Sequence, residues 1–157
     1  DATRETGYGG YTYQPGRFKK MAKDLIKTYK LKSNSKILDV GCGKGFLLHE
    51  MKLLLPKLQI VGFDISKYAI NKSTNLIKPC LFYHKAEKKY PFKKAFKEIS
   101  RVGKKSYIVV ESYKNDKQLF NLQCWALTCA SFFSVSSWKW IFKEFNYKGD
   151  YEFTFFD

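Results

Sequence analysis

The feature that most constrains this chain is a short apolar strand followed by a glycine-rich turn, at residues 36–48. Residues 37–40 (Ile-Leu-Asp-Val) have the composition of a buried strand, and glycine then occupies alternate positions from Gly41 to Gly45. Glycine lets the backbone turn tightly and lets a ligand approach the peptide groups with no Cβ in the way. An amphipathic helix is expected from Phe46, and its N-terminus offers free N–H groups. The stretch therefore predicts the nucleotide-binding corner of an α/β fold.

The residues of the turn restrict which nucleotide could bind. The phosphate loop of NTPases requires Gly-Lys followed by Ser or Thr, whereas Lys44 is followed by Gly45, so no hydroxyl is available for magnesium. A dinucleotide fingerprint would place its third glycine at the position of Phe46. Asp39, two residues before the first glycine, would repel a pyrophosphate. A carboxylate at this position suits a ligand that carries an ammonium or a sulfonium.

The segment Asp39-Val40-Gly41-Cys42-Gly43-Lys44-Gly45 resembles the first motif of the class I S-adenosylmethionine (SAM)-dependent methyltransferases. A second motif follows at residues 59–66, where an apolar strand ends at Asp64, 19 residues after Gly45. An acid at the tip of that strand can accept hydrogen bonds from both ribose hydroxyls of an adenosine. The alternative is a buried α/β unit whose glycines serve packing alone, and the pairing of two motifs at this spacing argues against it.

The resemblance implies a Rossmann-like three-layer α/β sandwich, with a mostly parallel central sheet and helices on both faces. It also implies SAM as the cofactor and S-adenosylhomocysteine as the product. Asp39 would hold the methionine amino group, and Asp64 would hold the ribose. The residues after a third predicted strand at 80–84 flank the adenine in this family; here the usual Asp-Ala pair is absent. The expected cofactor-binding residues are Asp39, Gly41, Cys42, Gly43, Gly45, Asp64, Ile65, Ala86 and Glu87.

Length and composition predict one cytoplasmic domain without a metal. A chain of 157 residues with 45% apolar residues can form one core, and no apolar run approaches the length of a membrane span. The chain shows no signal-peptide pattern. No metal-type spacing is formed by the cysteines and histidines, which are Cys42, Cys80, Cys124, Cys129, His49 and His84.

The net charge leaves the class of acceptor open. The chain carries 29 Lys and Arg against 14 Asp and Glu, a net charge of +15, and such a charge can attract nucleic acid. The lysines are spread over the predicted helices, however, which favours a solvated surface. A small-molecule O- or N-methyltransferase is therefore favoured. The alternatives are a nucleic-acid methyltransferase and a module that binds SAM without catalysis.

One element of the fold is not accounted for by the sequence. Phe92 leads directly into an amphipathic helix at residues 92–102, followed by a strand at 106–111. In a class I methyltransferase the central fourth strand would precede this helix, and no apolar run supplies it here. We therefore expect roughly 20–35 further residues, absent from this sequence, to belong near Phe92–Lys94. An intact mass of 18.4 kDa for the natural protein would contradict this expectation. A nucleic-acid methyltransferase motif (Asn/Asp-Pro-Pro-Tyr/Phe) is also absent, and it would fall in the same segment.

Candidate acceptor-binding residues occur at both ends of the chain. Residues 1–14 are rich in turn-forming residues and contain a Gly- and Tyr-rich run from Gly7 to Tyr13. This indicates either a flexible aromatic lead-in over a ligand, with Tyr11 as a contact, or a disordered tail. Arg17 could pair with a carboxylate of the substrate or cofactor. Trp125 is a candidate wall of the acceptor site, although a place in the core is an equally simple interpretation.

The candidate catalytic residues come from the ends of predicted strands. Glu111 is the leading candidate for a general base because it lies at the carboxyl end of a strand, where ligands bind in open α/β sheets. His84 and Tyr113 are the further candidates. The alternative for Glu111 is a structural carboxylate held by hydrogen bonds or an ion pair.

Three local expectations concern element boundaries. A helix is expected from Pro15-Gly16 to about Tyr29. Ser136 or Ser137 is expected to cap a second helix further along the chain. Residues 151–156 are expected to form a closing strand whose side chains alternate between exposed and buried.

Overall fold

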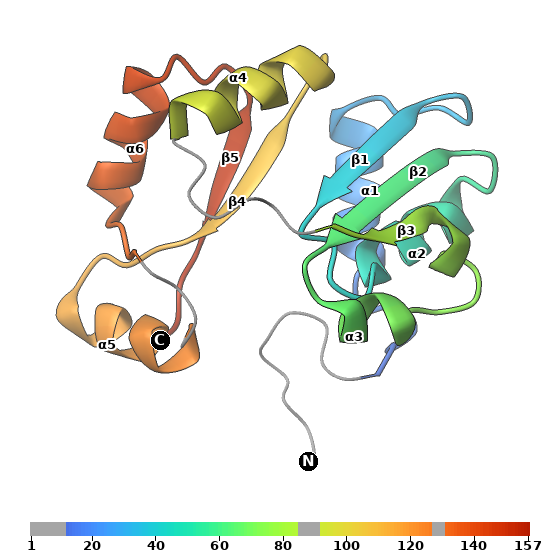
Figure 1. The fold of residues 1–157 in the computed structure, drawn as a ribbon, viewed down its shortest axis with the longest axis horizontal. Coiled ribbons are helices and arrows are strands. Elements are labelled where there is room, and N and C mark those ends of the chain that lie inside the picture. Colours follow the sequence, from blue (N-terminus) through green and yellow to red (C-terminus); the bar gives the residue numbers. More distant parts are fainter. Residues whose placement is uncertain (1–11, 85–91, 127–130) are drawn as a thin grey trace. The chain divides into compact units, whose positions relative to one another are not determined.

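The protein is described by a computed structural model, shown in Figure 1, that covers residues 12–84, 92–126 and 131–157. The chain divides into two compact units, Asp1–Glu87 and Lys88–Asp157. We call these the N-terminal and the C-terminal unit and describe each one separately.

The N-terminal unit is a parallel three-stranded sheet with helices. Its elements are α1 (Lys19–Thr28), β1 (Lys36–Val40), α2 (Phe46–Leu54), β2 (Gln59–Asp64), α3 (Lys67–Asn71), a 3-10 turn (Lys78–Cys80) and β3 (Leu81–Tyr83). The strand order is β1-β2-β3, and Asp39 pairs with Gly62 in the register of β1 and β2. Because the strands are parallel, the glycine turn after β1 and Asp64 at the end of β2 lie at the same edge of the sheet.

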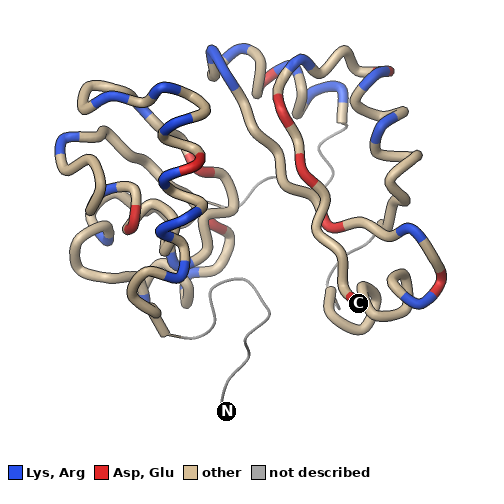
Figure 2. The backbone as a smooth tube through the Cα atoms, turned by 180° about the vertical axis from the view of Figure 1, so that it is seen from behind, with Lys and Arg blue, Asp and Glu red and all other residues tan. Residues whose placement is uncertain are grey.

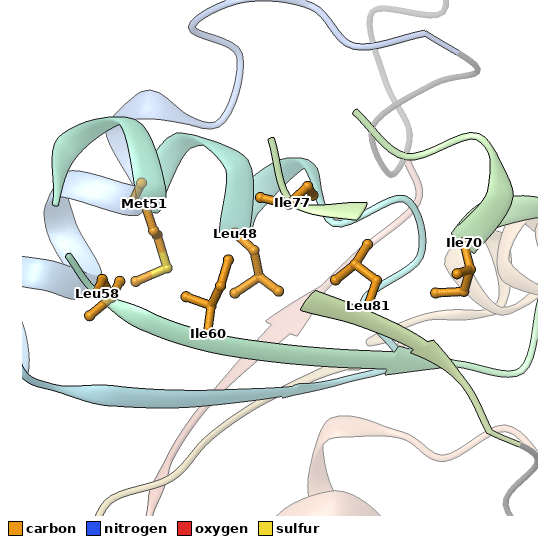
Figure 3. Close-up of a cluster of buried hydrophobic side chains, with 8 residues drawn as sticks. Leu48, Met51, Leu58, Ile60, Ile70, Ile77 and Leu81 are labelled. Carbon is orange, nitrogen blue, oxygen red and sulfur yellow. The ribbon is translucent and has the colours of Figure 1, made fainter. Parts of the chain in front are cut away.

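The core of the N-terminal unit lies on one face of this sheet, as Figure 3 shows. Apolar side chains of α2 meet the inward-facing residues of β2 and β3, and Leu48 and Leu58 are almost completely buried. The cluster comprises Ala22, Leu48, Met51, Leu58, Ile60, Ile70, Ile77 and Leu81. This packing fixes the direction of α2 relative to the strands, and therefore the position of the turn between them.

The opposite face of the sheet is apolar and exposed. Leu38, Val40, Val61 and Phe82 are each exposed by 43% or more. Sheets of parallel strands are normally covered on both faces. Within the described residues, β1 is an edge strand of its sheet. The predicted fourth strand would pair with this edge, and the second helical layer of a three-layer fold would cover this face.

The start of α1 differs from the sequence-based expectation. The helix begins at Lys19 rather than at Pro15-Gly16, because residues 15–18 form a turn. Gly16 has a φ of 81°, which is outside the helical region, and its carbonyl accepts a hydrogen bond from the Lys19 N–H. The third strand is also shorter than expected and covers Leu81–Tyr83 instead of residues 80–84.

The C-terminal unit pairs two parallel strands and packs helices on them. Its elements are α4 (Phe92–Val102), β4 (Tyr107–Glu111), α5 (Asp116–Trp125), α6 (Val135–Glu144) and β5 (Asp150–Thr154). The register of the strands runs from Tyr107↔Asp150 to Glu111↔Thr154. The core is largely aromatic, with Phe96 and Phe142 at its centre.

Two local expectations for the C-terminal unit are corrected. The residue that caps α6 is Ser134, whose hydroxyl accepts a hydrogen bond from the Ser137 N–H, so neither Ser136 nor Ser137 is the cap. The closing strand ends at Thr154, and its first three residues are all exposed, so its side chains do not alternate. The strand is therefore held by its pairing with β4 rather than by an alternation of buried and exposed side chains.

The described residues thus form parallel α/β structure in both units. The helix predicted at 92–102 and the strand that follows it are present, with the strand beginning one residue later than expected, at Tyr107. The organisation of the chain as one domain, with a further segment carrying a fourth strand near 92–94, stays a prediction.

Candidate cofactor site

The glycine turn between β1 and α2 has a left-handed backbone at each glycine. The φ angles are 77° at Gly41, 54° at Gly43 and 69° at Gly45. Non-glycine residues rarely adopt these angles, so the turn requires glycine at alternate positions. A Cβ built on Gly41 or Gly43 has no protein atom within 4 Å. The backbone at these two positions therefore faces open space that a ligand can enter.

Gly45 has a different role from the other two glycines. A Cβ at this position would lie 2.6 Å from Cδ1 of Ile77 and 2.9 Å from Cδ1 of Leu81. Gly62 on β2 is similarly enclosed, and a Cβ there would lie 2.9 Å from Sγ of Cys42. These close approaches let α2 and the turn pack directly on the sheet.

Asp64 connects the end of β2 to the glycine turn. Its Oδ2 accepts a hydrogen bond from the Gly43 N–H at 2.8 Å, and its Oδ1 accepts one from the Ser66 N–H at 2.7 Å. Ser66 in turn caps α3 by accepting a hydrogen bond from the Ala69 N–H. Ile65, between these two residues, is 61% exposed. The carboxylate of Asp64 is therefore held in place at the edge of the site.

Asp39 and Asp64 make the site electrostatically negative. Burial, followed by the charge of Asp64, raises the pKa of Asp39 to about 6. Burial and the same two carboxylates raise the pKa of the Cys42 thiol to about 12, so Cys42 is a neutral thiol at physiological pH. A bound cation would relieve the repulsion between the carboxylates. The arrangement thus fits a ligand with a positive charge better than one with phosphates.

The raised pKa of Asp39 predicts a pH-dependent stability. Between pH 4 and 6 the folded state binds the proton of Asp39 more tightly than the unfolded state does, so stability falls as the pH rises through this range. The change expected is about 3 kcal/mol in the free energy of unfolding. Denaturant titrations at several pH values would measure it. In Asp39→Asn this part of the pH dependence should disappear, and its persistence would contradict the assignment.

The structure brings a further group of residues to α2 that the sequence analysis missed. Glu50 is 2% exposed and accepts hydrogen bonds from the Tyr13 hydroxyl and the Gly16 N–H, both at 2.7 Å. Arg17, a predicted substrate contact, follows in the turn before α1. The available signal was an acid near the middle of the largely apolar sequence Phe46–Leu54. A sequence alone does not indicate which segment satisfies such a carboxylate.

Of the candidate catalytic and acceptor residues in the C-terminal unit, Glu111 and Trp125 lie next to each other. Burial raises the pKa of Glu111, and a hydrogen bond from Trp125 opposes this shift. Trp125 is 39% exposed, and its ring lies 5.4 Å from that of Phe156. Tyr113 forms a β-bridge with Ser134. Glu111 and Trp125 are thus neighbours, and Trp125 is not a core residue.

Of the remaining predicted site residues, only His84 lies within the described part of the chain. His84 follows β3, and its N–H donates a hydrogen bond to the Asp64 carbonyl at 3.1 Å. Tyr11, Ala86 and Glu87 lie outside the described residues. Among the residues that the structure describes, no group of His, Cys, Asp and Glu could hold a metal ion. None of the helices in this part of the chain combines the length and apolar character that a membrane crossing requires.

Comparison with known proteins supports the assignment of the glycine turn. The family model "Methyltransferase domain" matches residues 31–90, which include the turn, Asp39 and Asp64. This segment belongs to the methyltransferase-domain family. The predicted family is thereby confirmed for residues 31–90, which include most of the N-terminal unit.

Two curated relatives match part of this chain. A malonyl-[acyl-carrier protein] O-methyltransferase of Bacillus anthracis is 35% identical over 71 residues, which cover 41% of this chain and 26% of the relative. The protein of the same name from Legionella pneumophila is 61% identical over 31 residues, covering 20% of this chain and 11% of the relative. The chain thus spans about a quarter or less of the length of these relatives.

A solved structure shares the fold of the chain. The YcgJ protein from Bacillus subtilis superposes with a TM-score of 0.52 at 17% identity, covering 79% of this chain and 66% of that structure. The predicted α/β, Rossmann-like fold class is confirmed by this similarity and by the parallel strands.

Proposed function

We propose that this chain is a SAM-dependent methyltransferase that transfers a methyl group to an oxygen or nitrogen atom of a small-molecule acceptor. The observation that carries the proposal is the edge of the sheet at which Gly41 and Gly43 face open space beside the carboxylates of Asp39 and Asp64. The family match over residues 31–90 supports it. Both curated relatives are O-methyltransferases by name, which favours oxygen as the atom methylated.

In this proposal each cofactor-binding residue has a separate role. SAM, when bound, supplies a methyl group on a sulfonium sulfur: an acceptor attacks the methyl carbon in line, the C–S bond breaks and S-adenosylhomocysteine is the leaving group. Asp39 binds the methionine ammonium, and its negative charge also favours the sulfonium. Gly41 and Gly43 allow the methionine part to approach the backbone, and Asp64 accepts hydrogen bonds from the ribose hydroxyls. The remaining proposed contacts are Cys42, Gly45, Ile65, Ala86 and Glu87.

The proposal also assigns residues to the acceptor: a general base, a wall of the acceptor site and two substrate contacts. Glu111 is the proposed general base, because a carboxylate with a raised pKa accepts a proton more readily near neutral pH. His84 and Tyr113 are the alternatives for this role. Trp125, with its exposed indole, is proposed as a wall of the acceptor site. Tyr11 and Arg17 are the proposed substrate contacts near the N-terminus.

Calorimetric titration with SAM tests the proposal directly. We expect micromolar binding of SAM and no comparable binding of ATP, because Asp39 and Asp64 repel phosphates. A folded protein that binds neither compound would contradict the proposal. The noncatalytic alternative predicts binding of SAM with no S-adenosylhomocysteine formed with any acceptor.

A nucleic-acid acceptor is the second candidate, on the basis of the charge of +15. Figure 2 shows that Lys and Arg are distributed along both units rather than gathered in one segment. Binding of RNA that weakens steeply with salt, together with transfer of methyl groups to RNA, would favour this candidate. Weak binding with a shallow salt dependence would favour the small-molecule proposal.

A further inference from the structure

Glu50 is a buried carboxylate that accepts hydrogen bonds from two groups of the segment before α1. It lies on α2, is 2% exposed, and its Oε1 accepts from the Tyr13 hydroxyl and from the Gly16 N–H. Burial of a carboxylate is costly unless it is hydrogen-bonded or paired with a cation. No Lys or Arg forms a salt bridge with Glu50 within the described residues. Its burial therefore depends on residues 13–16 being in place.

Tyr13 places this segment on the first turns of α2, next to the glycine turn. The Tyr13 ring lies 5.6 Å from that of Phe46 and 4.3 Å from that of His49. Phe46 is the first residue of α2 and directly follows Gly45. His49 is itself held, because its Nδ1 lies 2.6 Å from Oγ1 of Thr74. Tyr13 thus packs on a fixed surface at the start of the helix.

We propose that Glu50 is a positioning residue that holds residues 13–16 against the start of α2 and thereby strengthens the binding of SAM at the glycine turn. This inference rests on the proposed function. Glu50 acts through Tyr13 and Gly16 and does not itself touch the cofactor. When residues 13–16 are held on α2, the turn and Phe46 have less conformational freedom. Less conformational entropy is therefore lost when the ligand binds.

A simpler explanation is that Glu50 stabilises the fold alone. Two observations favour the positioning role. The carboxylate is buried on α2 between His49 and Met51, and its hydrogen bonds reach 34 and 37 residues back along the chain to one short segment. The contacts also lie on the first half of α2, from Phe46 to Glu50, which follows the glycine turn directly.

The test compares variants of Glu50 with a control in the same helix. We expect Glu50→Ala to weaken SAM binding at least about tenfold, because both hydrogen bonds are lost, and Glu50→Gln to stay within about threefold, because its amide oxygen still accepts. Met51→Ala is the control, since Met51 is 3% exposed and belongs to the core cluster between α2 and the sheet. It should destabilise the protein and leave the affinity of the folded molecules within about threefold. Equal losses of affinity in Glu50→Ala and Met51→Ala, or an unchanged affinity in Glu50→Ala, would overturn the proposal.

A second measurement tests the contact without SAM. Burial and the Glu50 carboxylate raise the pKa of Tyr13 to about 12. The Tyr13 phenol, assigned by NMR through its absence in Tyr13→Phe, should titrate near this value in the wild type and lower in Glu50→Ala. A Tyr13 pKa unchanged by Glu50→Ala would overturn the proposed contact. If the folded wild type does not bind SAM, the proposed function fails and the positioning role fails with it, whereas a shifted Tyr13 pKa would still confirm the contact itself.

Discussion

Asp64→Ala is expected to weaken the binding of SAM about a hundredfold. In the proposed site its carboxylate accepts hydrogen bonds from both ribose hydroxyls, and hydrogen bonds to a charged group contribute about 1.5–3 kcal/mol each. A loss of about 3 kcal/mol corresponds to about a hundredfold in the dissociation constant. The variant also loses the hydrogen bonds from the Gly43 and Ser66 N–H groups, which position the glycine turn. Calorimetry with SAM measures the combined effect.

Two further variants separate the ribose contact from the structural role of Asp64. Asp64→Asn retains one carbonyl oxygen but presents an amide NH2 to the Gly43 or Ser66 N–H, so we expect an intermediate affinity. Ser66→Ala removes the cap of α3 and leaves the Asp64 carboxylate and the Ser66 N–H intact. It should lower stability by about 1 kcal/mol with no change in the binding of SAM. An affinity within about threefold of wild type in Asp64→Ala would exclude the ribose role.

The sequence signals on which the candidate cofactor site rests are local. An apolar run, three glycines at alternate positions and a following helix lie within one short stretch, and each has a direct physical meaning. The tip of β2 could be predicted because Asp64 follows an apolar strand and Ser66 has the character of a helix cap. Parallel pairing of β1 with β2 then places both motifs at one edge of the sheet.

The features that the sequence did not predict depend on contacts between distant residues. Nothing near Tyr13 indicates that its hydroxyl reaches Glu50, and nothing near Glu50 indicates its partner. The start of α1 was misplaced for a related reason, because the Gly16 N–H bonds to Glu50 and its backbone leaves the helical region. The distinct roles of the glycines were also hidden, since the side chains that enclose Gly45 come from residues 77 and 81.

Gly45→Ala is expected to lower the free energy of unfolding by about 3 kcal/mol. A left-handed φ of 69° costs an alanine about 1–2 kcal/mol. The new Cβ would also lie 2.6 Å from Ile77 and 2.9 Å from Leu81, and such overpacking typically costs about 1–3 kcal/mol. Because Ile77 and Leu81 belong to the core, the helix or β3 must shift to accommodate the methyl group. Denaturant unfolding measures the loss.

Gly43→Ala is the matched comparison, because it introduces the same methyl group in the same turn. Its φ of 54° strains an alanine by about 1 kcal/mol, but no protein atom lies within 4 Å of the new Cβ. The methyl group would instead occupy the open space beside Asp64, so the affinity for SAM should fall at least about tenfold while most of the stability remains. In Gly45→Ala the main loss should instead be in stability, because the new Cβ meets Ile77 and Leu81 rather than open space. If Gly43→Ala bound SAM as tightly as the wild type, the open space beside the turn would not be the cofactor site, and the glycines would serve packing alone.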